Sequence, residues 1–130
     1  MKRFLRFALL PSLLLFLVAI AWSCKSSGNK TMGTGGGTPA DVMITITGIN
    51  GANSYSPSTA NVTVGQTVAW KNSGGTTHTA TADGGAFDTG HVADGATSAP
   101  IQINTVGDLT YHCAIHGFAM TGTLHVTAVP

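Results

Sequence analysis

The stretch VTVGQTVAWKN, residues 62–72, alternates apolar and polar side chains on both sides of Gly65. Successive side chains of a β-strand point to opposite faces, so this alternation predicts two strands that each bury one face, separated by a turn at the glycine. Val68 and Trp70 share the apolar face of the second strand. We therefore expect Trp70 to lie in a hydrophobic core enclosed by β-sheets.

The same alternation continues through the rest of the chain after Ala40, and no segment there has a helical period. A Thr-rich piece around His78 also favours a strand. The other alternating segments are residues 42–47, 101–104, 109–113 and 124–126. Seven or eight short strands with turn signals between them predict an all-β domain, a sandwich of two sheets.

Residues 1–23 have the order of a secretory signal peptide. Three basic residues come first, and residues 7–22 are then almost wholly apolar. The closing segment Ala21-Trp22-Ser23-Cys24 resembles the processing site of bacterial lipoproteins, in which the cysteine carries the lipid. Ordinary signal cleavage and an uncleaved anchor are the alternatives, although the apolar run is short for a membrane span of about 20 residues.

Residues 24–39 are rich in Gly, Ser, Asn, Lys and Thr and cannot bury apolar surface. We expect this segment to be a flexible tether that begins at Cys24. Residues 40–130 are enough for one small domain with one core. A domain exported in this way, with Cys24 lipidated, would lie in the periplasm or on the outer face of a bacterial membrane.

Charged residues are scarce after Ser23. This part of the chain has three lysines, five aspartates, no arginine and no glutamate, a formal net charge of −2. A basic patch is missing, which argues against nucleic acid as a partner. The sequence shows no paired carboxylates, Ser-His-Asp set or phosphate-binding loop, and we do not expect an enzyme.

The chain has two cysteines, Cys24 and Cys113. In an exported protein two cysteines first suggest a disulfide, but lipidation would consume Cys24. Cys113 would then be a lone thiol outside the cytoplasm, where an unpaired thiol is exposed to oxidation. We interpret Cys113 as a metal ligand, with an accidental free thiol as the alternative.

Three other residues are candidate ligands for the same metal ion. His116 follows three residues later and Met120 four residues after that, while His78 lies upstream in a Thr-rich segment. Taken singly, Met120 would be a core residue and each histidine a surface residue. Together, a thiolate, two imidazoles and a thioether are the ligands of a blue-copper electron-transfer site, whereas methionine is a poor ligand for zinc.

From Val42 to Val126 the chain resembles the cupredoxins, of the small single-domain plastocyanin, pseudoazurin and amicyanin kind. The segments that carry the resemblance are Tyr55–Pro57, residues 62–72, His78–Thr79, Ala86–Gly90, Gly107–His116 and Met120–Gly122. The resemblance implies a Greek-key sandwich of two sheets. It also implies one type 1 copper with His78, Cys113 and His116 as equatorial ligands and Met120 as the axial ligand.

The resemblance has further implications for the surroundings of the site. Asn72 is expected to form hydrogen bonds near the copper. Gly117 and Phe118 are expected in an apolar surface patch around His116, through which electrons pass to redox protein partners, although Phe118 could instead be a core residue. The protein is expected to be a monomeric one-electron carrier.

His112 raises an alternative function. A histidine beside the cysteine ligates a second copper centre in copper nitrite reductases and multicopper oxidases, but only His91 and His125 are spare here. We expect all three to be surface histidines. Besides an electron carrier, the sequence leaves open a reductase that uses His112, and a copper chaperone or storage protein. The last class more often has clusters of methionine or histidine, which are missing here.

Overall fold

The computed structural model describes residues 39–130. The predicted signal peptide, almost all of the tether and the possible lipidation at Cys24 lie outside the described residues. Within the described part no helix is long and apolar enough to cross a membrane.

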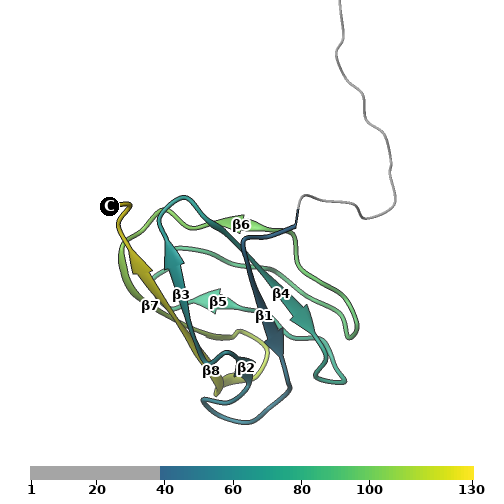
Figure 1. Cartoon of the computed structure of the whole chain (residues 1–130). Helices are drawn as coiled ribbons and strands as arrows, with labels where there is room; N and C mark the ends of the chain where they lie inside the picture. Colours follow the sequence, from purple (N-terminus) through teal and green to yellow (C-terminus); the bar gives the residue numbers. More distant parts are fainter. Residues whose placement is uncertain (1–38) are drawn as a thin grey trace, which may run out of the picture. The chain divides into compact units, whose positions relative to one another are not determined.

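The domain is a sandwich of two four-stranded sheets (Figure 1). The strands are β1 (Val42–Ile46), β2 (Tyr55–Ser56), β3 (Thr59–Thr63), β4 (Thr67–Asn72), β5 (Thr81–Ala82), β6 (Ile101–Gln102), β7 (Gly107–Cys113) and β8 (Gly117–Thr127). The first sheet has the order β2-β1-β4-β6 and the second β3-β8-β7-β5. In each sheet one pair is parallel, β1 with β4 and β3 with β8. The predicted all-β, two-sheet architecture is confirmed.

The alternating segment around Gly65 forms the two predicted strands, β3 and β4. β3 buries Ala60 and Val62, Gly65 turns with a φ of 93°, and β4 then crosses the middle of its sheet. A positive φ is readily adopted by glycine, which lacks the Cβ that makes it costly for other residues. Val68 and Trp70 are fully buried. The prediction that Trp70 lies in the core is confirmed.

Four aromatic side chains fill the centre of the core. Trp70 stacks on Phe87 with ring centroids 5.2 Å apart, and the edge of Tyr111 meets both rings at 5.9 and 5.6 Å. Tyr55 completes the cluster against Tyr111 at 4.7 Å. Offset and edge-to-face contacts of this kind add to the stabilisation from burial alone.

Two expectations about strands differ from the structure. His78 is in a loop and forms only an isolated bridge with Val92, so the strand predicted there is wrong. The chain there pairs only through His78 with Val92, and regular pairing starts at β5, where Thr81 and Ala82 pair with β7. The last strand extends beyond the alternating segment 124–126 and begins at Gly117, which pairs with Cys113 of β7; pairing resumes at Thr121 after a bulge.

Both tyrosines of the chain are buried, which predicts how the protein responds to alkali. Burial raises the pKa of Tyr111 to about 12 and raises the pKa of Tyr55 as well, with the nearby Cys113 adding to the shift of Tyr55. The folded state therefore holds these protons more tightly than the unfolded state, whose phenols ionise near pH ~10. This contribution to stability is complete below pH ~10 and is lost as the pH rises towards the folded-state pKa values.

We expect no tyrosinate absorbance from the native protein at pH values where a free tyrosine is already ionised. The signal should appear together with the loss of circular dichroism in an alkaline titration, whereas the urea-unfolded protein should titrate near pH ~10. Tyrosinate absorbance that rises near this pH while the dichroism stays native would contradict the burial of the two phenols.

Candidate metal centre

Three predicted ligands meet at one end of the sandwich. Cys113 is the last residue of β7, and a tight turn follows in which the His116 N–H donates to the Cys113 carbonyl at 3.1 Å. His78 comes from the loop after β4, on the other sheet. The ligand atoms of these three residues all lie within 4.8 Å of one another. Residues 35 positions apart in sequence are thus brought together by the packing of two sheets.

The spacing of these atoms fits one metal ion. The two histidines face each other through Nδ1, 3.2 Å apart. The Cys113 Sγ atom is 3.4 Å from Nδ1 of His116 and 3.9 Å from Nδ1 of His78. Nitrogen and sulfur ligands bound at about 2.0 and 2.3 Å to a common metal are separated by about 3.3–3.8 Å. Two imidazoles and a thiolate in this arrangement suit copper.

Met120 lies on β8 and is fully buried. It belongs to the same cluster of buried side chains as Cys113. A thioether is a soft, weak ligand, and in sites with two histidines and one cysteine it occupies the long axial position. Three of the four predicted ligands thus have their ligand atoms in one measured cluster, and Met120 as the fourth ligand stays a prediction.

Solvent reaches this cluster from one side. His78 and Cys113 are at most 1% exposed, whereas His116 is half-buried. Burial lowers the pKa of His78, and the neighbouring His116 ring lowers it further. A neutral imidazole is the form that binds a metal. His116 is thus the ligand through which the site meets the surface.

Thr79 connects the two ligand segments, a role that its residue type alone does not predict. Its backbone N–H donates to the Cys113 Sγ atom at 3.3 Å, which stabilises a thiolate. Its hydroxyl accepts the N–H of Ala114 at 2.7 Å, and its carbonyl accepts the hydroxyl of Tyr55 at 2.6 Å. Only the position of Thr79 next to His78 could have pointed to it.

Asn72 holds the loop that carries His78. Its side-chain amide donates to the carbonyls of Thr76 and Val92 at 2.7 and 2.8 Å, and its oxygen accepts the N–H of Gly74 at 2.9 Å. The loop in turn encloses the far edge of the imidazole, where the Thr76 hydroxyl lies 3.3 Å from Nε2 of His78. Contacts of this kind fix the orientation and tautomer of a ligating histidine.

Gly74 is part of the same enclosure. A Cβ atom at this position would lie 2.7 Å from Nε2 of His78 and 2.8 Å from the backbone nitrogen of Gly48. Neither neighbour can move freely, because the His78 ring is buried and the Gly48 contact is with backbone. The close approach of this loop to the ring therefore requires glycine.

Two exposed apolar side chains lie close to the half-buried His116 along the chain. Phe118 is 74% exposed and Ile115 is 46% exposed, on either side of His116 and Gly117. This exposure decides between the two interpretations of Phe118, which is a surface residue. Its ring lies 4.9 Å from the ring of His112.

The remaining histidines are apart from the cluster. Nδ1 of His112 pairs with the Asp83 carboxylate at 2.5 Å, and His125 pairs with Asp108 in the same way. His91 is exposed. In residues 39–130 the group around Cys113 is the one place where three or more potential metal-binding side chains of the His, Cys and acidic types converge.

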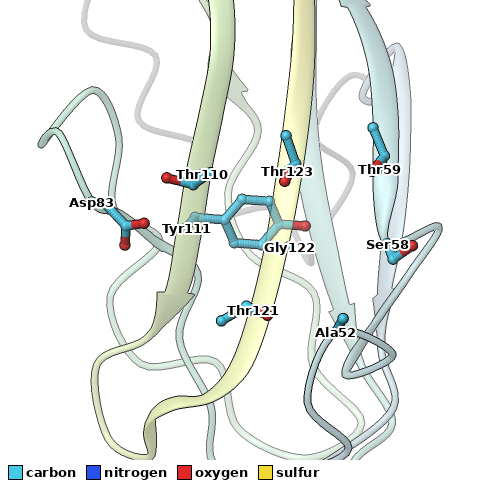
Figure 2. Close-up of a pocket in the computed structure, with 9 residues that line it drawn as sticks. All are labelled: Ala52, Ser58, Thr59, Asp83, Thr110, Tyr111, Thr121, Gly122 and Thr123. Atoms are coloured by element: carbon cyan, nitrogen blue, oxygen red, sulfur yellow. The ribbon is translucent and has the colours of Figure 1, made fainter.

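A hollow of about 320 Å³ lies on the outer face of the second sheet (Figure 2). Hydroxyl-bearing side chains surround most of it. Its lining residues are Ala52, Ser58, Thr59, Asp83, Thr110, Tyr111, Thr121, Gly122 and Thr123. None of the four predicted copper ligands is among them, so this hollow is separate from the metal centre.

Comparison with known proteins gives the fold a name. No protein-family description and no curated protein sequence matches the chain. Among solved structures, a purple cupredoxin from Nitrosopumilus maritimus superimposes with a TM-score of 0.57 and 25% identity, covering 67% of this chain and all of that one. The domain is a cupredoxin in fold. Amicyanin structures agree, one with a TM-score of 0.58, 21% identity and coverage of 70% of this chain and 86% of amicyanin.

The resemblance inferred from sequence is therefore confirmed for the fold. A second amicyanin structure, described as a reduced Cu(I) form, is 23% identical, with a TM-score of 0.57 and coverage of 69% of this chain and 87% of that one. In this cupredoxin fold, the donor set of two imidazoles, a thiolate and a thioether is suited to a single copper ion.

Proposed function

We propose that this cupredoxin is a one-electron carrier. Nδ1 of His78, Sγ of Cys113 and Nδ1 of His116 would hold one copper ion, with Met120 as the weak axial ligand. The observation that carries the proposal is the convergence of these three atoms, two of them on buried side chains. Bound copper would supply the redox chemistry by changing between Cu(II) and Cu(I), to which soft sulfur and imidazole ligands are suited.

The chain's own residues keep the site rigid and dry. Asn72 and Thr76 hold His78 from behind, and the N–H of Thr79 donates to the cysteine sulfur. Three of the four proposed ligands are excluded from water. Ligands held in fixed positions need little rearrangement when the charge of the ion changes, which favours fast electron transfer.

The apolar patch around His116 is the proposed docking surface for redox protein partners. Ile115 and Phe118 give it exposed apolar area, and the half-buried His116 gives a short path to the copper. Residues 39–130 contain one lysine and five aspartates, so electrostatic steering is weak and apolar contact would carry most of the recognition. We propose a monomer that works outside the cytoplasm, lipid-anchored through Cys24, on the basis of the leader sequence.

The test is to load the purified protein with Cu(II) and record its visible spectrum and a reversible redox titration. The expected result is one copper per chain, an intense thiolate-to-copper band, and complete, reversible bleaching on one-electron reduction. A folded protein that binds copper without this band would contradict the proposal and favour copper storage or delivery. Turnover of a substrate by the loaded protein would instead favour a reductase.

A further inference from the structure

The backbone around Met120 is poorly supported by the sheet in which it lies. On one side, the β7–β8 pairing passes from His112 opposite Thr121 to Cys113 opposite Gly117. Residues 118–120 are therefore bulged and face no partner on β7. On the other side, β3 joins β8 only from Thr123 onward. The residue proposed as the axial ligand thus lies in a stretch that neither neighbouring strand holds.

A turn between β1 and β2 supplies the missing support. Gly51 forms an isolated parallel bridge with Met120. The N–H of Gly51 donates to the carbonyl of Ala119 at 2.9 Å, and the N–H of Thr121 donates to the carbonyl of Gly51 at 3.1 Å. These two hydrogen bonds hold the residues on both sides of Met120. Figure 2 shows the loop that carries Ala52, the next residue, beside the strand that carries Thr121.

The turn is closed by a buried serine. Ser54 is fully buried, and its hydroxyl accepts the N–H of Asn50 at 2.8 Å. The N–H of Asn53 also donates to the carbonyl of Asn50, and the carbonyl of Ser54 accepts the N–H of Thr47 at the end of β1. Gly51 at the tip has a φ of 55°, a conformation that favours glycine. The turn is therefore a closed unit, fastened to β1 at its base and to β8 at its tip.

We propose that the turn Asn50–Ser54 positions the side chain of Met120 at the metal centre, with Ser54 as the positioning residue that keeps the turn closed. This inference rests on the proposed function, in which Met120 is the axial ligand. When the Ser54 hydroxyl is removed, the Asn50 N–H loses its acceptor and the tip of the turn loosens. Met120 then moves more freely, and its thioether binds the copper more weakly. Weaker axial donation stabilises Cu(II) less, so the reduction potential rises.

The test compares four single variants and one double variant of the full-length, copper-loaded protein. Ser54→Ala opens the turn at its base, and Gly51→Ala strains its tip without a steric clash, because no atom lies within 4 Å of the added Cβ. Met120→Leu removes the axial thioether altogether. Ser98→Ala is the matched control, since the Ser98 hydroxyl likewise accepts a backbone N–H, that of Trp70, at 3.0 Å on β4.

We expect Ser54→Ala and Gly51→Ala to change the intensity ratio of the thiolate-to-copper bands in the same direction as Met120→Leu, and Ser98→Ala to leave it unchanged. At equilibrium with a fixed redox couple, Ser54→Ala should change the Cu(II)/Cu(I) ratio about threefold or more towards Cu(I). In the double variant with Met120→Leu, Ser54→Ala should add no further change. In the metal-free protein, amide exchange at Gly51 and Thr121 should be faster in Ser54→Ala.

Two failures can be told apart. A shift in Met120→Leu without one in Ser54→Ala and Gly51→Ala overturns the positioning role of the turn and leaves the proposed copper site standing. A Met120→Leu protein with unchanged spectrum and potential shows that Met120 is not the axial ligand, which overturns that part of the proposed function and this inference with it. Equal shifts in Ser54→Ala and Ser98→Ala also overturn the inference, because a general loosening of the domain would then explain both.

Discussion

Cys113→Ser is expected to abolish the intense visible band of the copper-loaded protein while the fold is kept. The sulfur is fully buried, lies within 4 Å of both histidine nitrogens and accepts the N–H of Thr79. A serine hydroxyl does not ionise under the same conditions and is a hard ligand, poorly suited to Cu(I). Loss of a contact outside the ligand set already costs about 10–100-fold in metal affinity, so we expect a fall in Cu(I) affinity of more than about 100-fold.

The measurement is a copper titration followed by visible absorption, together with thermal unfolding of the metal-free proteins. Serine is nearly the same size as cysteine, so the metal-free variant should unfold within about 1 kcal/mol of the wild type. His78 and His116 remain, and weak, nearly colourless binding of Cu(II) is expected. A strong band that survives in Cys113→Ser would mean that another group, and not this thiolate, is bound to the copper.

Gly122→Ala is expected to lower the free energy of unfolding by about 3 kcal/mol. Gly122 lies opposite Tyr111 on the β7–β8 hairpin. A Cβ atom there would be 2.4 Å from Cζ and 2.5 Å from the hydroxyl oxygen of Tyr111. The tyrosine ring cannot retreat, because it is fully buried and packed between Tyr55 and Phe87.

Urea unfolding of the metal-free protein measures this effect, with Gly84→Ala as the matched control. Gly84 is exposed, has no atom within 4 Å of an added Cβ and does not have a positive φ. The same substitution there should change stability by no more than about 0.5 kcal/mol, or raise it slightly by restricting the unfolded chain. Equal midpoints for the two variants would contradict the close approach of Tyr111 to β8.

The parts of the fold that follow from local pattern could be predicted from sequence. The alternation around Gly65 places β3, β4 and Trp70, because one buried face per strand is a property of neighbouring residues. The strand expected at His78 was wrong for a complementary reason. Strand propensity is present there, but a strand also needs a partner elsewhere in the chain, and His78 pairs only with Val92, in an isolated bridge.

The candidate site also has parts that the sequence predicts and parts that it does not. The kinds and spacing of the residues after Cys113 were enough to predict a shared metal centre. The supports of that centre were not predictable, because Thr79 and the turn ending at Ser54 act mainly through backbone hydrogen bonds to distant segments. A threonine or serine that accepts or orients such bonds has no sequence pattern of its own. The exposure of Phe118 likewise depends on the bulge opposite Cys113.

The direction of β1 determines at which end of the domain the chain enters. In the parallel pairing, Val42 lies beside Val68, and Ile46 lies beside Asn72, whose side chain reaches the loop of His78. The chain thus enters the domain at the pole opposite the copper site, and the last strand ends at that same pole (Figure 1). Both ends of the domain thus lie away from His116, so an attachment made directly at either end, to an electrode for example, would leave the surface around His116 uncovered.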